Sequence, residues 1–212
     1  MTLRKIIAHV RTSDNKEQSL QTHLLEVSAI AGKFAQKIGM KEAGQLLGLM
    51  HDFGKYSQQF QTYIQSGAGL LNPDIDDDYV DAKSLKGKID HSSAGAQWVW
   101  NKLSRYGKHR QGELCGRILA LCIASHHSGL IDCLNVDGGD VFNKRIKKED
   151  EKTNLDECSR TADLRILEIA NELANKPLIR SMLEKIEQFC FEKYNDHEIS
   201  HVSVHNGEII ND

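Results

Sequence analysis

The chain contains 212 residues, of which 40% are hydrophobic and 27% charged, and its formal net charge is −3. This composition is typical of a globular protein and excludes a wholly disordered chain. The slight negative charge argues against a globally basic nucleic-acid-binding protein, although it leaves room for a local basic patch. No apolar run approaches the roughly 18 residues that span a bilayer, and the five cysteines form no C-x-x-C pair. We therefore expect no membrane segment, no disulfide framework and a cytoplasmic location.

Apolar residues at helical spacing predict three helices in the first third of the chain. The first is expected over residues 16–38, with an apolar stripe made of Leu20, Leu24, Val27, Ala31, Phe34 and Ile38. A second helix is expected over residues 41–53, and a short third helix over residues 56–65. Residues 66–90 contain glycines, a proline and a cluster of aspartates, which predict an exposed loop.

Helical spacing returns in the second half. We expect a helix that begins at Ser92 or Ser93, and a second helix over residues 113–125. Residues 128–160 lack a clear period and are predicted to form a long surface excursion. The last two helices are expected over residues 163–174 and 178–194. The predicted fold class is therefore all-α, a helical bundle with long surface loops, in which one domain covers residues 1–194 and a polar tail covers residues 195–212.

The stripe expected on the helix over residues 113–125 contains Leu114, Ile118, Leu121 and Cys122. These residues recur at steps of three and four, so they would lie on one face of the helix. We expect that face to pack against the core.

The most informative local motif is His51-Asp52, followed by Gly54-Lys55, at the end of an apolar helix. Adjacent residues of a helix point about 100° apart, so two neighbouring ligands can flank one metal ion or bridge two. Imidazole together with carboxylate suits Mn, Fe, Co, Ni or Zn, and carboxylate alone tolerates Mg. A His-Asp pair is common by chance, so its meaning depends on the other histidines.

Those histidines fall at related places in the predicted bundle. His23 lies on the core side of the first helix, His91 precedes a helix start, and His126-His127 closes a strongly apolar helix. Each alone is compatible with a hydrogen-bonded core or capping histidine, but together they predict a cluster inside the bundle. The predicted metal ligands are His23, His51, Asp52, His91, His126 and His127. Six ligands exceed one tetrahedral zinc site and suit two cations, with Asp52 as the bridge.

The order and context of these motifs resemble the HD superfamily of metal-dependent phosphohydrolases. More narrowly, the sequence is similar to the HD nuclease of type I CRISPR systems, which accompanies a superfamily-2 helicase. The motifs that carry the resemblance are AHV at 8–10, LQTHL at 20–24, HDFGKYSQQFQ at 51–61, DHSSAGA at 90–96 and SHHSGL at 125–130. By this resemblance His23, His51 and Asp52 match the first ligand and the name-giving pair. In the same way His91, His126 and His127 match the ligands of the second metal.

The resemblance also implies an activity. It implies a metal-dependent nuclease that hydrolyses single-stranded DNA in CRISPR interference and antiviral defence. Two divalent ions (Mg, Mn, Fe, Co or Ni) would be its cofactors, and a helicase subunit or domain and the CRISPR surveillance complex its partners. Asp52 and Lys55 would be catalytic, with Lys55 near the scissile phosphate, whereas His9 matches a frequent histidine without an assigned role.

One element of the family pattern is missing. The family adds a late aspartate on a C-terminal helix, and Asp163, in TADLRIL, lies in a different context. The helicase motifs are absent too, so the sequence fits a stand-alone subunit or a domain of a longer protein.

DNA binding would need local cations. Two groups stand out in the sequence: Lys102, Arg105, Lys108, Arg110 and Arg117, and further along Lys144, Arg145, Lys147 and Lys148. Each group taken alone is better explained by a solvated face of mixed charge. No feature suggests recognition of a base sequence, so binding should be sensitive to salt.

Two other functions remain open from the sequence. The same scaffold could carry a nucleotide or cyclic-nucleotide phosphohydrolase, which differs from a nuclease in how open its pocket is. Alternatively, the bundle could be a metal-stabilised docking module without turnover, a reading that the missing late aspartate favours.

Overall fold

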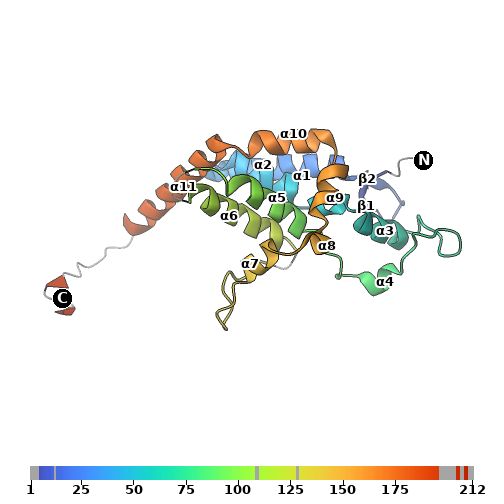
Figure 1. The fold of residues 1–212 in the computed structure, drawn as a ribbon. Coiled ribbons are helices and arrows are strands. Elements are labelled where there is room, and N and C mark those ends of the chain that lie inside the picture. The colour runs from blue at the N-terminus through green and yellow to red at the C-terminus, as the bar shows by residue number, and fades with distance from the viewer. Residues whose placement is uncertain are drawn as a thin grey trace.

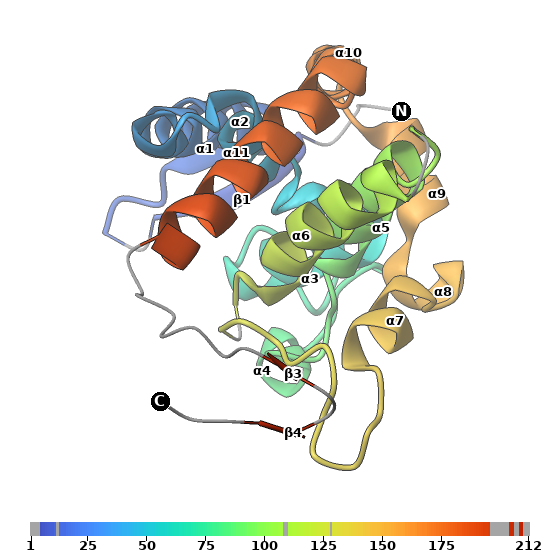
Figure 2. The ribbon, with the colours of Figure 1, turned by 90° about the vertical axis from the view of Figure 1, so that its left-hand side faces the viewer.

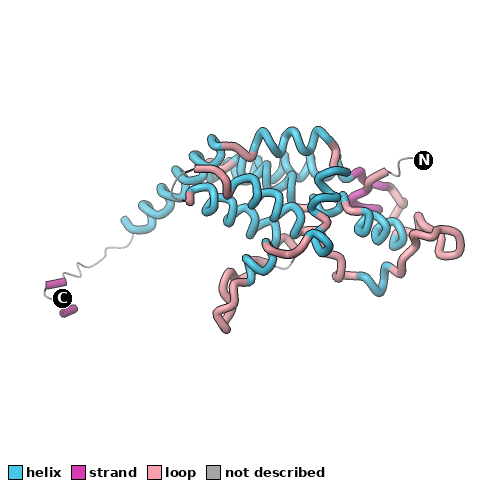
Figure 3. The backbone as a smooth tube through the Cα atoms, viewed as in Figure 1, coloured by secondary structure: helices cyan, strands magenta, loops and turns pink. Residues whose placement is uncertain are grey.

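The computed structural model describes residues 5–11, 13–107, 110–127, 129–195, 204–205 and 208–209. Helices dominate these ranges, so the predicted all-α fold is confirmed (Figures 1 and 3). The α-helices are α1 (Leu20–Ala35), α2 (Lys41–Met50), α3 (Gln58–Gly67), α4 (Ala82–Leu85), α5 (Ser93–Leu103), α6 (Gln111–Ser125), α7 (Val141–Ile146), α8 (Asp150–Thr153), α9 (Leu155–Thr161), α10 (Leu164–Leu173) and α11 (Lys176–Asn195). Two 3-10 turns, η1 (Gln36–Ile38) and η2 (Phe53–Tyr56), follow α1 and α2.

A short β-hairpin precedes α1, where the sequence predicted the start of a long helix. Strand β1 (Ile7–Val10) pairs antiparallel with β2 (Glu17–Ser19), which leads directly into α1. Ser19 caps this helix, because its side chain accepts a hydrogen bond of 3.1 Å from the backbone N–H of Thr22. The predicted start at residue 16 was therefore wrong, and the helix begins four residues later.

Helices α1 and α2 pack closely against each other and form one half of the bundle (Figure 2). A Cβ atom on Gly48 would lie 2.6 Å from the carbonyl oxygen of Val27, so only glycine allows this approach. The side of α1 that packs there contains Leu20, Leu24, Ser28 and Gly32. Phe34 and Ile38, which were predicted in the stripe, are 63% and 50% exposed. The predicted stripe was right at its N-terminal end and wrong beyond it.

Helices α5 and α6 form the second half of the bundle. A Cβ atom on Gly95 of α5 would lie 1.9 Å from the carbonyl oxygen of Met50, so α5 also meets the end of α2 closely. The buried side of α6 contains Cys115, Leu119 and Ile123, whereas Leu114 of the predicted stripe is 45% exposed. The predicted face was partly right, since Ile118 and Leu121 pack against the core. The fully buried side differs because α6 is apolar around most of its circumference, so its period could not select the side that meets α5.

The region over residues 128–160 is not a simple surface excursion. Helices α7, α8 and α9 form within it, and Phe142 and Cys158 are fully buried. Asp140 caps α7 by accepting a hydrogen bond of 2.8 Å from the backbone N–H of Asn143. The sequence did not reveal these helices because each is too short to show a helical period.

The last two helices were predicted correctly in number and place. Helix α10 lies against α2, and α11 contacts α6 and α2. In Figure 1, α3 and α4 lie at one end of the molecule and α11 extends at the other. No helix within the described ranges is long and apolar enough to cross a membrane.

Most of the predicted tail, residues 195–212, lies outside the described residues. Within it the structure describes the antiparallel pair β3 (Val204–His205) and β4 (Glu208–Ile209). The division into a domain over residues 1–194 and a tail over residues 195–212 therefore stays a prediction.

Candidate metal centre

The six residues predicted as metal ligands lie together in the bundle. His23 comes from α1, His51 and Asp52 from the end of α2, and His91 from the loop that leads into α5. The pair His126 and His127 follows α6. Asp52 lies at the centre and is 3% exposed, and its two carboxylate oxygens face two different sets of imidazoles.

The first set surrounds the Oδ2 oxygen of Asp52. His23 Nε2 and His51 Nε2 each lie 3.1 Å from it, and the Nζ of Lys55 lies at 2.9 Å. The two imidazole nitrogens are 3.2 Å apart. Both histidines thus direct the same ring atom at one oxygen of the carboxylate.

The second set faces the Oδ1 oxygen of Asp52. His126 Nε2 lies 3.3 Å from this oxygen and His91 Nε2 at 3.6 Å. His127 Nε2 lies 2.7 Å from His91 Nε2. The carboxylate therefore stands between two groups of nitrogen donors, which is the arrangement expected of a bridging ligand.

Backbone carbonyl groups select the tautomers of two of these histidines. His51 Nδ1 lies 2.8 Å from the carbonyl oxygen of Gly48, and His126 Nδ1 lies 2.7 Å from that of Ile123. A carbonyl oxygen only accepts, so Nδ1 carries the proton in both rings. Each Nε2 then presents its lone pair to Asp52, as in histidines that bind metals.

The electrostatics keep the carboxylate of Asp52 charged and the imidazole of His91 neutral. Burial by itself would raise the pKa of Asp52, but the imidazoles of His126, His23 and His51 and the charge of Lys55 hold it well below its usual range. Burial, assisted by Lys55 and neighbouring histidines, lowers the pKa of His91 to about 4. Near neutral pH the site therefore offers the carboxylate of Asp52 and the neutral imidazole of His91.

This donor set fits divalent cations. Within the described residues, Asp52 Oδ1 and His126 Nε2 are buried without a hydrogen-bond partner, which is costly unless a cation satisfies both. Two overlapping groups have ligand atoms within 4.8 Å of one another: Asp52, His91, His126 and His127, and His9, His23 and Asp52. Asp52 belongs to both groups. Nitrogen and carboxylate donors of this kind suit first-row divalent metals.

His9 is the member of these groups to which the sequence assigned no role. It lies on β1, and its ring meets that of His23 edge to face with the centroids 4.8 Å apart. Burial lowers the pKa of His9 to about 4, with Lys55 and His23 contributing, so its imidazole is also neutral. The unpredicted β1–β2 hairpin brings His9 here, because β2 leads into the helix that carries His23.

Lys55 lies inside the site and borders a cavity beside His91. Its side chain is 5% exposed, and its Nζ contacts the carbonyl oxygen of Ala8 at 3.3 Å as well as Asp52. Helix α9 contacts the turn that carries Lys55. There the Cys158 thiol donates a hydrogen bond of 3.6 Å to the carbonyl oxygen of Gly54. The sequence gave no signal for the contribution of Cys158.

A network of polar contacts fixes the loop that carries His91. Asp90 accepts hydrogen bonds from the backbone N–H groups of Ser92 and Ser93, at 3.1 and 3.0 Å, and so caps α5 in place of the predicted serine. Lys148 Nζ lies 2.5 Å from Asp90 Oδ2, and Arg145 donates to Ser92 Oγ at 3.0 Å. The segment around α7 thus anchors the second set of ligands.

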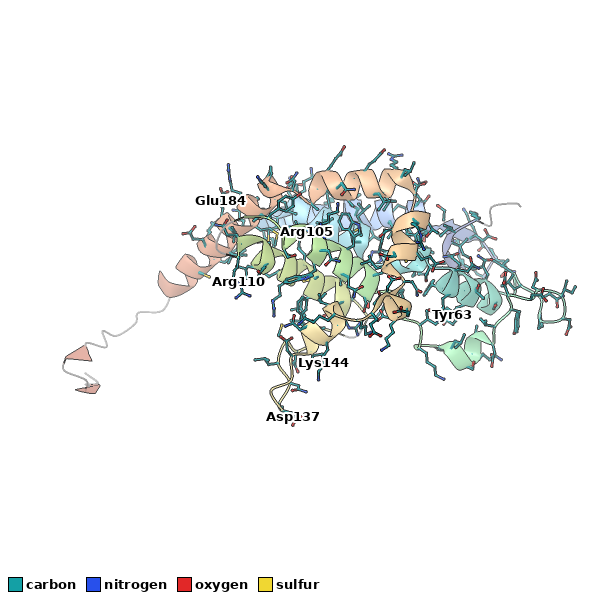
Figure 4. All side chains as sticks on the ribbon, viewed as in Figure 1. Tyr63, Arg105, Arg110, Asp137, Lys144 and Glu184 are labelled. Carbon is teal, nitrogen blue, oxygen red and sulfur yellow. The ribbon has the colours of Figure 1, made fainter. Side chains whose placement is uncertain are left out.

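The two predicted basic groups end up in different places. Figure 4 shows Arg105 and Arg110 near α11, away from Tyr63. Helix α6 separates Arg110 from His126 by roughly 24 Å, given its rise of about 1.5 Å per residue. Arg145 and Lys148 instead line a cavity beside His91 and His127. Lys108 lies outside the described residues.

A comparison with protein-family profiles identifies the family to which this chain belongs. The profile described as "Cas3, HD domain" matches residues 9–188, a range that contains both groups of ligands and the helices that carry them. The chain belongs to the Cas3 HD-domain family. The predicted resemblance is therefore confirmed, and the Cas3 HD match supports a CRISPR-associated nuclease domain of the metal-dependent hydrolase class. A comparison with curated proteins gave no match.

Among the residues that the structure describes, the late aspartate expected of this family has no counterpart at the site. Asp163 caps α10, where its side chain accepts a hydrogen bond of 2.9 Å from the backbone N–H of Arg165. Neither group of candidate ligands in the described residues includes it. In the described part of this Cas3 HD domain, Asp52 is the carboxylate that both groups share.

Proposed function

We propose that this chain is a nuclease that hydrolyses phosphodiester bonds in single-stranded DNA with the help of two divalent cations. One observation supports this more than any other. The two oxygens of a single buried carboxylate, Asp52, face two separate sets of imidazoles. That arrangement suits a pair of cations with a shared ligand, as in metal-dependent phosphoryl hydrolysis.

The residues would divide the work as follows. His23, His51 and Asp52, joined by His9, would hold one cation, and Asp52, His91, His126 and His127 the other. Bound divalent cations lower the pKa of water and neutralise charge on a phosphate. Lys55 supplies a fixed positive charge at Asp52 and borders the cavity beside His91, where a phosphate oxygen could reach it.

The surroundings of the site favour a strand over a small nucleotide. Cavities of about 510 Å³ and 190 Å³ adjoin His91 and His127, and one of about 640 Å³ adjoins His9. Cavities therefore adjoin both groups of candidate ligands, as a bound strand would require. A site for a single nucleotide would instead enclose most of its ligand.

The partners and setting follow from the family. We propose that the chain acts in the cytoplasm in CRISPR interference and antiviral defence, with a superfamily-2 helicase and the CRISPR surveillance complex. A helicase would supply the single strand that the site requires.

The test is a cleavage assay on circular single-stranded DNA and, in parallel, on mononucleotides and cyclic nucleotides. We expect metal-dependent cleavage of the circle, inhibition by EDTA, and complete loss in Asp52→Ala. The exposed Asp77→Ala serves as a control of equal charge change. Full activity in Asp52→Ala would end the proposal. Turnover of small nucleotides alone would favour the phosphohydrolase alternative, and strong stabilisation by metal without turnover would favour a docking module.

A further inference from the structure

A small recess lies next to the metal centre, between α3 and the segment that follows α4. It has a volume of about 190 Å³, and its lining includes Tyr63, Leu85 and Ile89 together with Lys55 and His91. In Figure 4 Tyr63 lies between α3 and α4. The metal ligands, hydrophobic side chains and an aromatic ring therefore border the same space.

Aromatic rings connect this recess to the metal ligands. The ring of Phe60, which is 5% exposed, lies 4.8 Å from that of His91 and 5.7 Å from that of Tyr63, measured between centroids. Tyr63 is half-buried and completes the series on the outer side. Leu85 and Ile89 also line the recess and give it an apolar wall. A flat aromatic group could lie between that wall and Tyr63.

Basic residues line the cavity next to the recess. A neighbouring cavity of about 510 Å³ shares Ile89, His91 and His127 with it and is also lined by Lys86, Lys88, Arg145 and Lys148. Asp90 partly neutralises Arg145 and Lys148. Lys86 and Lys88 are exposed, and no ion pair among the described residues involves them. Their charges are available for an anion that reaches the metal centre.

We propose that this recess binds one nucleobase of the DNA strand, stacked on Tyr63, while Lys86 and Lys88 hold the phosphates on either side. The inference rests on the proposed nuclease function and adds the part of the substrate that this site recognises. Stacking on an aromatic face accepts any base and requires a base that has left its duplex. The recess thus explains selection of single strands without recognition of sequence.

The decisive variant is Tyr63→Ala, compared with Tyr63→Phe. We expect Tyr63→Ala to raise the KM for a single-stranded oligonucleotide by about 5- to 100-fold, because the base loses its stacking partner. The ring is retained in Tyr63→Phe, so its KM should stay near that of the wild type. Phe34→Ala, which removes an exposed ring on α1, is the control. Thermal unfolding and metal content of each variant show whether the fold and the metal centre are intact.

An oligonucleotide made entirely of abasic nucleotides isolates the role of the base. The wild type should bind this abasic strand more weakly than it binds the ordinary oligonucleotide. The Tyr63→Ala variant should bind the abasic strand as tightly as the wild type does. Binding is measured by fluorescence anisotropy of labelled strands, so it reports on the recess even without cleavage.

The lysines are tested through salt dependence. For a single strand, each phosphate contact contributes about 0.7 to the slope of log affinity against log salt. The double variant Lys86→Ala/Lys88→Ala should reduce that slope by about 1.4. Lys33→Ala/Lys41→Ala removes two exposed charges elsewhere and should leave it unchanged.

The outcomes separate this inference from the proposed function. If the wild type cleaves DNA but Tyr63→Ala keeps its KM, or weakens the abasic strand equally, the base site is wrong and the nuclease stands. If the wild type cleaves no DNA while Tyr63→Ala still weakens binding of the ordinary strand alone, the recess stands and the nuclease proposal fails.

Discussion

At Asp52, the ability of one carboxylate to share cations depends on backbone groups that set the tautomers of the neighbouring histidines. Its carboxylate is useful as a shared ligand only if the surrounding imidazoles present lone pairs and not protons. The carbonyl oxygens of Gly48 and Ile123 select the matching tautomer of His51 and His126, since each accepts the Nδ1 proton. The helix ends therefore set the chemistry of the ring nitrogens that face the carboxylate.

The two sets of ligands should lose their metal independently. We expect His91→Ala to empty the set at Oδ1, and His23→Ala to weaken the set at Oδ2, each lowering metal content from about two ions per chain towards one. Asp52→Ala should lower it at both. Metal analysis by ICP-MS after desalting measures this, with Asp77→Ala as control. Equal loss of all metal in both histidine variants would contradict two separable sites.

Lys55 should matter for turnover more than for metal retention. Its Nζ lies 2.9 Å from Asp52 Oδ2, so Lys55→Ala removes a cation that competes with a metal for the same oxygen. We expect metal content to be kept and kcat to fall by about 100-fold or more, a typical cost of losing one stabilising charge. Steady-state cleavage assays and ICP-MS on one preparation measure both. Loss of metal would contradict this role.

At the scale of elements, the position of the loop before α5 depends on contacts with a segment more than fifty residues further along the chain. Lys148 and Arg145 hold Asp90 and Ser92, and the side chain of Gln97 donates to the carbonyl oxygens of Ile146 and Lys148 at 2.9 and 2.8 Å. These contacts fix where His91 enters the site.

Removal of Asp90 should therefore destabilise the helix that it caps. We expect Asp90→Ala to lower the free energy of unfolding by about 0.5–2 kcal/mol, the usual cost of a lost cap, and more if Lys148 is left unpaired. Urea denaturation with EDTA present measures the protein without a contribution from metal. Asp77→Ala is the matched control, and an unchanged midpoint would show that the cap is dispensable.

Cys158 ties α9 to the turn that follows Asp52, and it predicts a dependence on pH. Burial raises the pKa of its thiol to about 12, and the charges of Glu157 and Asp150 add to the effect. The thiol ionises near pH 8.5 in the unfolded chain. The contribution of Cys158 to the free energy of unfolding is therefore fully present below that pH and is lost as the pH rises towards 12.

The matching experiment compares unfolding between pH 8 and pH 10. Wild type should lose stability with a limiting slope of up to about 1.4 kcal/mol per pH unit for this group once the pH exceeds the unfolded pKa. Cys158→Ala should lose less, whereas Cys190→Ala, at an exposed position, should follow the wild type. Buried Cys115, whose pKa is raised to about 11, leaves some dependence in all variants. Identical curves for Cys158→Ala and wild type would contradict this.

At the scale of the whole molecule, the site lies where the two halves of the bundle meet. Helices α1 and α2 bring one set of ligands and α5 and α6 the other, with α10 and α11 packed on the outside (Figure 2). The most C-terminal core residue in the described part of the chain is Met182. The core thus ends well before residue 195.

Truncation after residue 194 tests the proposed domain boundary. Because no core residue of the described structure is removed, we expect the shortened protein to keep its metal content and its Tm within about 2 °C. Differential scanning calorimetry with and without EDTA measures this. A loss of several degrees would show that residues 195–212 belong to the domain.

Much of this protein could be read from the sequence alone. The long helices, the all-α class and the choice of six candidate ligands depend on local patterns: helical periodicity, and rare side chains at helix ends. His51-Asp52 and His126-His127 are pairs of neighbouring residues, so both motifs could be recognised in the sequence without any tertiary information.

Other features were decided only by tertiary structure, because they depend on which surfaces meet. The period of α6 is compatible with several buried faces, and packing against α5 selects the one that contains Leu119. The position of His9 follows from strand pairing, and the anchoring of Asp90 by Lys148 joins residues 58 positions apart. Which imidazoles face which oxygen of Asp52 was likewise decided only when the helices packed together. A local sequence pattern does not determine the direction in which a side chain points inside the core.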